Sequence, residues 1–348
     1  ALAVTAMGTI LAAATGIIGA SVVMLTVMAL PTMLKRGYSP ELASGTVASA
    51  GTLGILIPPS VMLVFMGDIL TINLAKLFIA ALAPGLVLAA VYMVYIIVST
   101  VLRPAQAPAV PPLTPEEKVG LWREAAVSFG LPFILIVAVL GSIVVGLASP
   151  TEAAAVGAFA ALLLGVLRGR LTFKVLGQTM DSSVRTLAMV FFIFVAATGY
   201  AYIFRLIGGE HFIVGVAQSL NMGDWGILIM LMVIIFILGF FFDWIEITLI
   251  MLPIIAPIVA LMDFGEHVAK ADMIYWFAVL MAVNLQTSFL TPPFGFALFY
   301  LKGAASDLVS MGQIYRGIIP FVLLQLGVLI LLIWQPWIVL WLPGQMLQ

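Results

Sequence analysis

The stretch "GTLGILIPPS", residues 51–60, lies within a run from residue 43 to residue 67 that contains no charged side chain. Each proline removes a backbone N–H donor and clashes with the preceding turn, so the adjacent pair interrupts any helix that contains it. The stretch therefore predicts a broken helix inside a strongly apolar segment. What such a break can do depends on the solvent around it.

The composition identifies that solvent as a lipid bilayer. Of the 348 residues, 64% are hydrophobic and 8% are charged, and the mean hydropathy is +1.26. Soluble domains contain about a quarter charged residues, so we expect an all-α polytopic membrane protein. The net charge of −1, without a basic block, argues against a nucleic-acid partner. The absence of cysteine excludes disulfides and thiolate metal sites. Because the chain begins "ALAVTAMGTI", without an initiator methionine or a signal peptide, we expect an N-terminal truncation.

Several apolar segments are long enough to cross the hydrocarbon core, which takes about 20 residues. These predicted crossings are residues 77–102, 126–147, 150–167, 186–207 and 317–342. Short mixed segments at 116–125, 171–184, 208–223 and 303–316 are predicted to be amphipathic helices in the interface. In "SPTE", Ser149, Pro150 and Glu152 fit a capping box at the start of the third crossing.

Residues 1–34 are too many for one crossing and too few for the roughly 40 residues of two. Their midpoint, "TGIIGAS", contains glycines that suit a turn at membrane depth, which predicts a re-entrant hairpin. Residues 225–262 repeat the arrangement, with "FFDWIE" at the midpoint. Two hairpins of the same kind are therefore expected.

A second proline pair follows the second hairpin, in "NLQTSFLTPPFGFALF" at residues 284–299. Ser21 and Asp243 each lie ten residues before a proline, Pro31 or Pro253. Five crossings separate the hairpins if the first broken helix is included, and an odd number predicts an inverted repeat. The expected units are a first repeat at 1–67 (hairpin 1–34, broken helix 43–67), connecting and scaffold helices at 75–223 with a cytoplasmic linker 103–125, a second repeat at 225–301 (hairpin 225–262, broken helix 272–301), and an interfacial and a terminal helix at 303–348.

The positive charges predict which side each loop faces. With Lys35 and Arg36 in the cytoplasm, 11 of the 14 lysines and arginines fall inside. Lys76, Arg205 and Lys270 are then outside, and so is the C-terminus. The opposite orientation would invert this ratio, so we reject it.

Irregular backbone persists at membrane depth only where it is buried in protein or lines a cavity. A single broken helix is most simply a kink, but two copies, each after a hairpin, are typical of secondary transporters. These proteins build midplane sites in which helix N-termini face anions and freed carbonyls face cations. The sequence has no HExxH motif and no nucleophile with a paired base in a crossing, which argues against an intramembrane enzyme. A channel is disfavoured because re-entrant pore loops usually surround an axis between subunits.

Three segments resemble the large membrane subunit, of the DctM type, of tripartite ATP-independent periplasmic (TRAP) transporters. They are "MLKRGYSPELASGTVASAGTLGILIPPS", "GLASPTEAAAVGAFAALLLGVLRGRLTFKVL" and "TPPFGFALFYLKG". The segment "DWIEITLIMLPIIAPIV" is most similar to the branch named for mannitol or chloroaromatic compounds. Two features depart from the family: about four leading helices are missing, and Ala20 stands beside a single Ser21 where the family is often richer in serine and glycine.

The resemblance implies sodium-driven import of a small organic acid, such as a C4-dicarboxylate or a related carboxylate, by an elevator-like movement. It implies two protein partners, a periplasmic substrate-binding protein and a small four-helix membrane subunit, in the bacterial cytoplasmic membrane with its lipids. Na⁺ would be the coupling ion, without another cofactor or a transition metal. The alternative is a stand-alone sodium-coupled divalent-anion symporter, which would transport without a soluble partner.

Oxygen ligands suit Na⁺, so hydroxyls, amides and backbone carbonyls freed by prolines are the candidates for its sites. The first predicted site comprises Thr15, Gly16, Gly19, Ser21, Thr52, Gly54, Pro58 and Pro59, and the second comprises Asp243, Asn284, Gln286, Thr287, Thr291, Pro292, Pro293 and Gly295. Close packing by small residues is the alternative for the first site. Asp243 and Glu246 are the carboxylates deep in a hairpin, and capping of its second arm is their alternative role. Tyr275 and Trp276 are predicted to be interfacial anchors, and His267 is not expected to bind metal.

Overall fold

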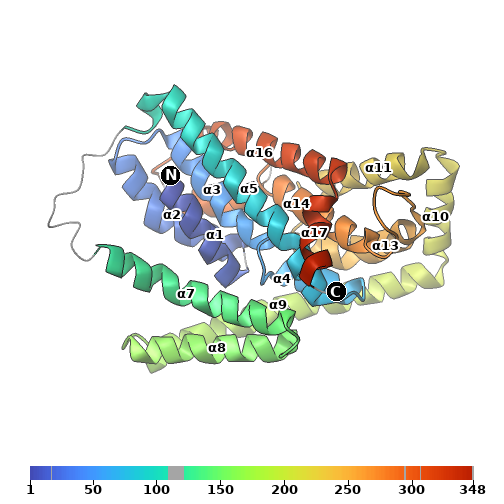
Figure 1. Ribbon diagram of the computed structural model, residues 1–348, viewed down its shortest axis with the longest axis horizontal. Coiled ribbons are helices and arrows are strands. Elements are labelled where there is room, and N and C mark those ends of the chain that lie inside the picture. Colours follow the sequence, from blue (N-terminus) through green and yellow to red (C-terminus); the bar gives the residue numbers. More distant parts are fainter. Residues whose placement is uncertain (17, 109–120, 294, 306, 347–348) are drawn as a thin grey trace.

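The computed structural model describes residues 1–16, 18–108, 121–293, 295–305 and 307–346 (Figure 1). All regular secondary structure in these residues is helical. Within them, six helices are long and apolar enough to cross a membrane, which confirms an all-α polytopic membrane protein. They are Ile18–Lys35, Leu74–Leu102, Pro150–Leu167, Phe173–Leu206, Trp244–Leu261 and Met311–Trp334.

The first hairpin consists of α1 (Leu2–Thr15) and α2 (Ile18–Lys35). Gly16 lies between them with a positive φ of 61°, a conformation that glycine adopts without steric cost. The broken helix follows as α3 (Pro40–Thr52), the short η1 (Leu53–Ile55) and α4 (Val61–Ile69). Helix α4 begins just beyond the proline pair, as the sequence predicts.

The second hairpin repeats this order. Its first arm is α11 (Gly223–Leu238), and its second arm runs through α12 (Trp244–Glu246), a π-helical segment (Ile247–Met251) and α13 (Leu252–Leu261). The broken helix after it consists of α14 (Met273–Ser288) and α15 (Phe296–Ala305). The chain therefore contains two copies of a helical hairpin followed by an interrupted helix. Both Pro–Pro peptide bonds are cis.

The connecting helices occupy the middle of the chain. They are α5 (Leu74–Leu102), η2 (Pro104–Gln106), α7 (Leu121–Val144), α8 (Pro150–Leu167), α9 (Phe173–Leu206) and α10 (Gly209–Ser219). The prediction of an interfacial helix at 171–184, separate from a crossing at 186–207, is wrong because α9 is one helix of 34 residues. The predicted capping box is confirmed, since Ser149 and Glu152 form both of its hydrogen bonds. Part of the predicted linker, residues 109–120, lies outside the described residues.

The C-terminal region also differs from the prediction of one crossing at 317–342. Helix α16 (Met311–Trp334) ends before Pro336, and α17 (Trp337–Met346) is a separate helix. Trp276 is completely buried and donates from Nε1 to the Leu332 carbonyl at 2.9 Å, and Nε2 of His267 donates to the Ile333 carbonyl at 2.9 Å. These side chains cap the last turn of α16, whose carbonyls lack partners within the helix. Trp276 is therefore no interfacial anchor.

Helix α3 lies at the centre of the bundle, where it packs on α1, α2 and α16 (Figure 1). A Cβ atom at Gly45 would overlap the backbone of Gly317 in α16, and one at Gly317 would overlap the carbonyl of Glu41. Small residues allow this close approach, which is common between membrane helices. Helix α14 is equally buried, because almost every one of its side chains is shielded.

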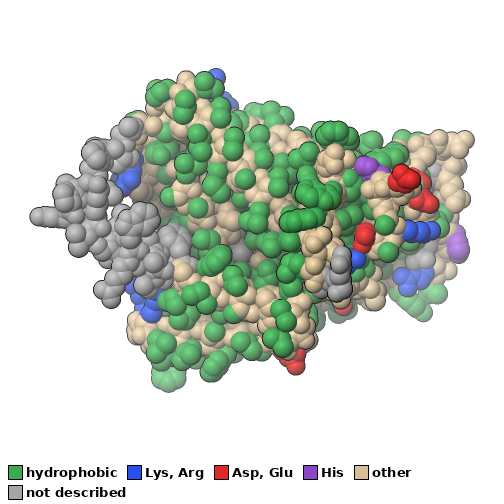
Figure 2. Space-filling model, viewed as in Figure 1, with side chains coloured by type: hydrophobic (Ala, Val, Ile, Leu, Met, Phe, Trp, Pro, Cys, Tyr) green, Lys and Arg blue, Asp and Glu red, His purple; other side chains and the backbone are tan. Residues whose placement is uncertain are grey.

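Helices α8 and α9 lie on the outside. Each buries a single described side chain, Ala153 in α8 and Ala197 in α9. Figure 2 shows hydrophobic side chains over most of one face of the molecule, with charged side chains mainly toward its edges. The apolar parts of this surface are suited to contact with hydrocarbon.

Candidate functional site

A cavity of about 120 Å³ lies where the two hairpin units meet. Both hairpins, both broken helices and α9 contribute to its wall. The described lining residues are Ile18, Gly19, Val61, Thr186, Met189, Val190, Asp243, Trp244, Ile245, Phe296 and Tyr300. Elements more than 200 residues apart in the chain therefore build one site.

The cavity is surrounded by the beginnings of helices. Ile18, Val61, Trp244 and Phe296 are the first residues of α2, α4, α12 and α15, and all of them line it. The first turn of a helix has unpaired N–H groups and the positive end of the helix dipole. Helix N-termini are therefore ready-made anion sites, and here two copies of the repeat supply two each.

Asp243 lines the cavity and also begins the second arm of its hairpin. Its Oδ1 accepts from the backbone N–H of Trp244 at 2.8 Å, while Glu246 Oε2 accepts from the N–H of Asp243 at 2.9 Å. This is the capping role that the sequence left as an alternative. Glu246 lines a different, apolar pocket with Leu238 and Phe242. Of these two carboxylates, only that of Asp243 is among the described groups that line the shared cavity.

Gly19 and Tyr300 join the two units within the wall of the cavity. A Cβ atom at Gly19 would lie 3.1 Å from Cζ of Tyr300, so the ring rests on the start of α2. Helices α2 and α15 contact each other along this surface. The ring of Tyr300 therefore fixes the spacing between the first hairpin and the second broken helix.

The tip of the first hairpin rests on the break of the first interrupted helix. A Cβ atom at Gly16 would lie 3.2 Å from Val61 and 3.6 Å from the carbonyl oxygen of Pro59. Thr52 is fully buried at the end of α3 and donates to the Ser49 carbonyl at 2.9 Å. Ser21, Gly54 and Pro58 are also buried near these elements, Ser21 in the fourth position of α2. The side chain of Thr15 lies outside the described residues.

The residues of the second predicted site are distributed along α14 and its break. Asn284 donates to the Met232 carbonyl in α11 at 2.6 Å, which ties the broken helix to the hairpin. Thr287 and Thr291 each donate to the carbonyl four residues earlier, both at 2.8 Å. Gly295 is buried with a φ of 50°, Pro292 is partly buried, and the carbonyl of Pro293 accepts from Tyr315. None of these residues is among the described residues that line the cavity.

Gln286 does not face the cavity. It is fully buried and points toward Tyr92 of α5, whose hydroxyl accepts from Gln325 of α16. Both polar atoms of the Gln286 amide lack a hydrogen-bond partner in the described residues. The structure therefore separates Gln286 from Asp243 and places it in a polar cluster with Tyr92 and Gln325.

Sequence reasoning missed Tyr300 and Thr186, both of which line the cavity. Tyr300 lies nine residues beyond the start of the motif "TPPFGF", and Thr186 marks the point where the polar part of α9 becomes apolar. A hydroxyl within an otherwise apolar span was the available signal. Within the described residues, no three histidine, cysteine, aspartate or glutamate side chains form a metal-binding group.

The sequence of this chain matches one family of known proteins along most of its length. The family model for "Tripartite ATP-independent periplasmic transporter, DctM component" matches residues 1–338. The C4-dicarboxylate TRAP transporter large permease protein DctM of Pseudomonas aeruginosa is 32% identical over 335 residues, which cover 96% of this chain and 74% of that protein. The ectoine/5-hydroxyectoine large permease protein UehC of Ruegeria pomeroyi is 29% identical, covering 98% and 76%. The 2,3-diketo-L-gulonate large permease protein YiaN of Escherichia coli is 28% identical, covering 94% and 73%.

Proposed function

Because the chain belongs to the DctM component family of tripartite ATP-independent periplasmic transporters, we propose that it imports a small organic acid by coupling to a sodium gradient. It is a multi-pass membrane protein, and the proposed location is the bacterial cytoplasmic membrane with a periplasmic C-terminus. C4-dicarboxylates and 2,3-diketo-L-gulonate, which appear in the names of two relatives, belong to the proposed substrate class.

The convergence of four helix N-termini on the cavity supports this proposal most strongly. The positive ends of the helix dipoles favour a carboxylate there without an arginine or lysine among the described lining residues. The cavity of about 120 Å³ accommodates a small charged group rather than a large ligand. Recognition of the rest of the substrate is then assigned to the periplasmic binding protein.

The charge balance of the site supports the proposed sodium coupling. The Asp243 carboxylate in the cavity wall would repel a substrate carboxylate unless a cation lies nearby. Thr52 and Thr287 have lone pairs free for such a cation, because each hydroxyl uses its proton on a backbone carbonyl. Binding of Na⁺ beside the breaks would thus prepare the cavity for the anion, and movement of the two hairpin units against the outer helices would complete an elevator-like cycle.

The proposed partners are a periplasmic substrate-binding protein and a small four-helix membrane subunit. Uptake of a radiolabelled C4-dicarboxylate into proteoliposomes containing the complete system would test the proposal. We expect accumulation only with an inward sodium gradient and with the binding protein present. Accumulation with potassium in place of sodium would reject the coupling ion. Accumulation without binding protein would favour the stand-alone symporter.

A further inference from the structure

We propose that an uncharged polar stripe on α9 forms the path along which the organic anion moves between the cavity and the membrane surface. The stripe consists of Gln178, Thr179, Ser182, Ser183 and Thr186. This inference rests on the proposed function, because the stripe needs a transported anion. It assigns a role to residues that lie outside both predicted ion sites.

The stripe is continuous with the cavity through one side chain. Together with Leu187, its residues form the described wall of an open groove of about 650 Å³ along the exposed face of α9. Thr186 lines this groove and also the cavity at the hairpin tips. Met189 and Val190, one turn farther along, line only the cavity. A molecule that leaves the cavity past Thr186 therefore enters the groove directly.

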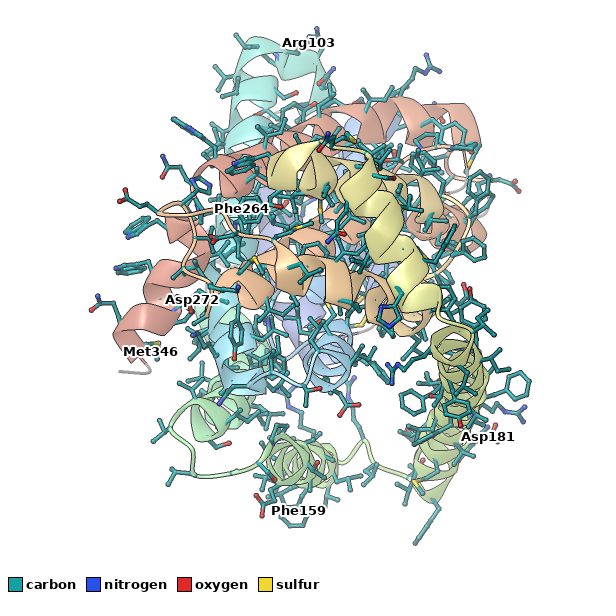
Figure 3. The ribbon with its side chains drawn as sticks, turned by 90° about the vertical axis from the view of Figure 1, so that its right-hand side faces the viewer. Arg103, Phe159, Asp181, Phe264, Asp272 and Met346 are labelled. Atoms are coloured by element: carbon teal, nitrogen blue, oxygen red, sulfur yellow. The ribbon has the colours of Figure 1, made fainter. Side chains whose placement is uncertain are left out.

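The stripe is one face of the helix and not a general polar region. Gln178, Ser182 and Thr186 follow each other at intervals of four residues, which places them on the same side. Charged side chains occupy another face, where Arg185 Nε pairs with Asp181 Oδ2 at 2.9 Å. Figure 3 shows Asp181 on the part of α9 that lies apart from the central bundle. Because the charged side chains and the uncharged polar side chains occupy separate faces, this part of α9 differs from a helix that is solvated on all sides.

The chemistry of the stripe suits passage rather than tight binding. The side chains of Gln178, Ser182 and Ser183 are exposed in the groove, so their N–H and O–H groups are accessible to donate to a carboxylate. A path must bind its substrate weakly enough to release it, and neutral donors do this better than a lysine or an arginine. From Leu187 to Ala197 the helix contains no polar side chain, so the stripe ends at the cavity.

The chain contains no cysteine, so a single introduced thiol can report on this face. Ser183→Cys places a thiol in the groove, and Val184→Cys places one on the opposite side of α9, where Val184 is 58% exposed. The probe is a negatively charged methanethiosulfonate reagent applied to the complete reconstituted system. We expect modification of Ser183→Cys to remove most of the uptake and to be slowed by saturating substrate. Modification of Val184→Cys should leave uptake unchanged.

Unmodified variants separate this proposal from the proposed function. If Ser183→Cys transports with sodium dependence but keeps its uptake after complete modification, the path is rejected while the transporter assignment stands. Substrate that protects neither Ser183→Cys nor a second variant, Ser182→Cys, also rejects the path. If neither wild type nor variants transport, both proposals fall. Complete modification in each case is verified by mass spectrometry.

Discussion

The Asp243 carboxylate takes part in both the fold and the cavity. It accepts the Trp244 N–H to begin the second arm of the hairpin, and it lies in the wall that the two units share. Asparagine is about as good an N-cap as aspartate, so the two roles can be separated experimentally.

We therefore expect Asp243→Asn to fold normally but to need about 10- to 150-fold more sodium for half-maximal uptake, since a lost charge-assisted contact is worth about 1.5–3 kcal/mol. Glu246→Gln is the matched control, because it belongs to the same capping box and lines a different pocket. Sodium titrations of uptake measure both variants. An unchanged sodium titration for Asp243→Asn would show that this carboxylate acts only as a helix cap.

The contact between Gly19 and Tyr300 makes a second prediction at this scale. A methyl group at residue 19 would lie within 3.3 Å of three ring atoms and would push the ring toward a cavity of about 120 Å³. We expect Gly19→Ala to raise the substrate concentration for half-maximal uptake. Gly303→Ala on the same helix as Tyr300, with open space around it, should have no effect. Equal behaviour of the two variants would contradict the assigned role of this contact.

Among the helical elements, the two interrupted helices offer the clearest comparison. Thr52 ends α3, and Thr287 is the last residue but one of α14. Each lies just before a break and donates to a carbonyl of its own helix. If their oxygens bind sodium, Thr52→Val and Thr287→Val each lose a ligand worth about 1 kcal/mol, which is about a fivefold change in sodium affinity. Sodium titrations should show each shift, and the double variant should couple fewer ions. If all three variants keep the sodium dependence of the wild type, the ion sites lie elsewhere.

Helices α3 and α16 cross in close contact within the central bundle. Because a Cβ atom at Gly317 would overlap the Glu41 carbonyl, we expect Gly317→Ala to lower stability by about 1–3 kcal/mol through overpacking. Gly327→Ala in the same helix has no atom within 4 Å and should leave stability unchanged. Thermal unfolding in detergent would compare them, and similar midpoints would show that the crossing tolerates separation.

Most helices could be predicted from the sequence, because glycines, prolines and the length of an apolar run determine where a helix begins and ends from nearby residues alone. The sequence predicted both hairpins and both breaks, but it divided α9, since hydropathy reports the surroundings of a helix and not its continuity. The segment "SSVRTL" contains no helix breaker, and Arg185 pairs with Asp181 one turn away. The opposite error occurs at 317–342, where an uninterrupted apolar run predicted one helix although α16 ends before Pro336. The surroundings of Tyr300 and Gln286 depend on contacts between segments far apart in the chain, and a sequence pattern does not contain these contacts.

For the whole molecule, the two units are joined at a second place besides the cavity. Lys76 Nζ lies 2.6 Å from Asp272 Oδ1 and 4.6 Å from the centroid of the Tyr275 ring, while the Tyr275 hydroxyl accepts from the Asn73 N–H. These contacts tie the turn after α4 to the start of α14. The two interrupted helices are therefore held together at this turn and at the cavity, so we expect them to move as one body.

The inversion of the two units that the sequence predicts can be tested by their sidedness. Arg36 directly follows the first hairpin and Met222 directly precedes the second, and both are exposed. In cells, an impermeant thiol reagent should label Met222→Cys from the periplasm and Arg36→Cys only after permeabilisation. Labelling of both from one face would refute the inversion. Since neither residue lines the cavity, uptake by the unlabelled variants serves as the folding control.

The four helix beginnings around the cavity also bear on how such a protein can diverge. Their positive potential comes from peptide N–H groups, which every residue except proline supplies, so an ordinary point mutation there changes shape and volume without removing the preference for an anion. Selection can therefore alter which acid fits while the electrostatic preference is inherited unchanged. If the cavity binds the substrate anion as proposed, we expect new cargoes to arise by small steps, each starting from a molecule that still transports.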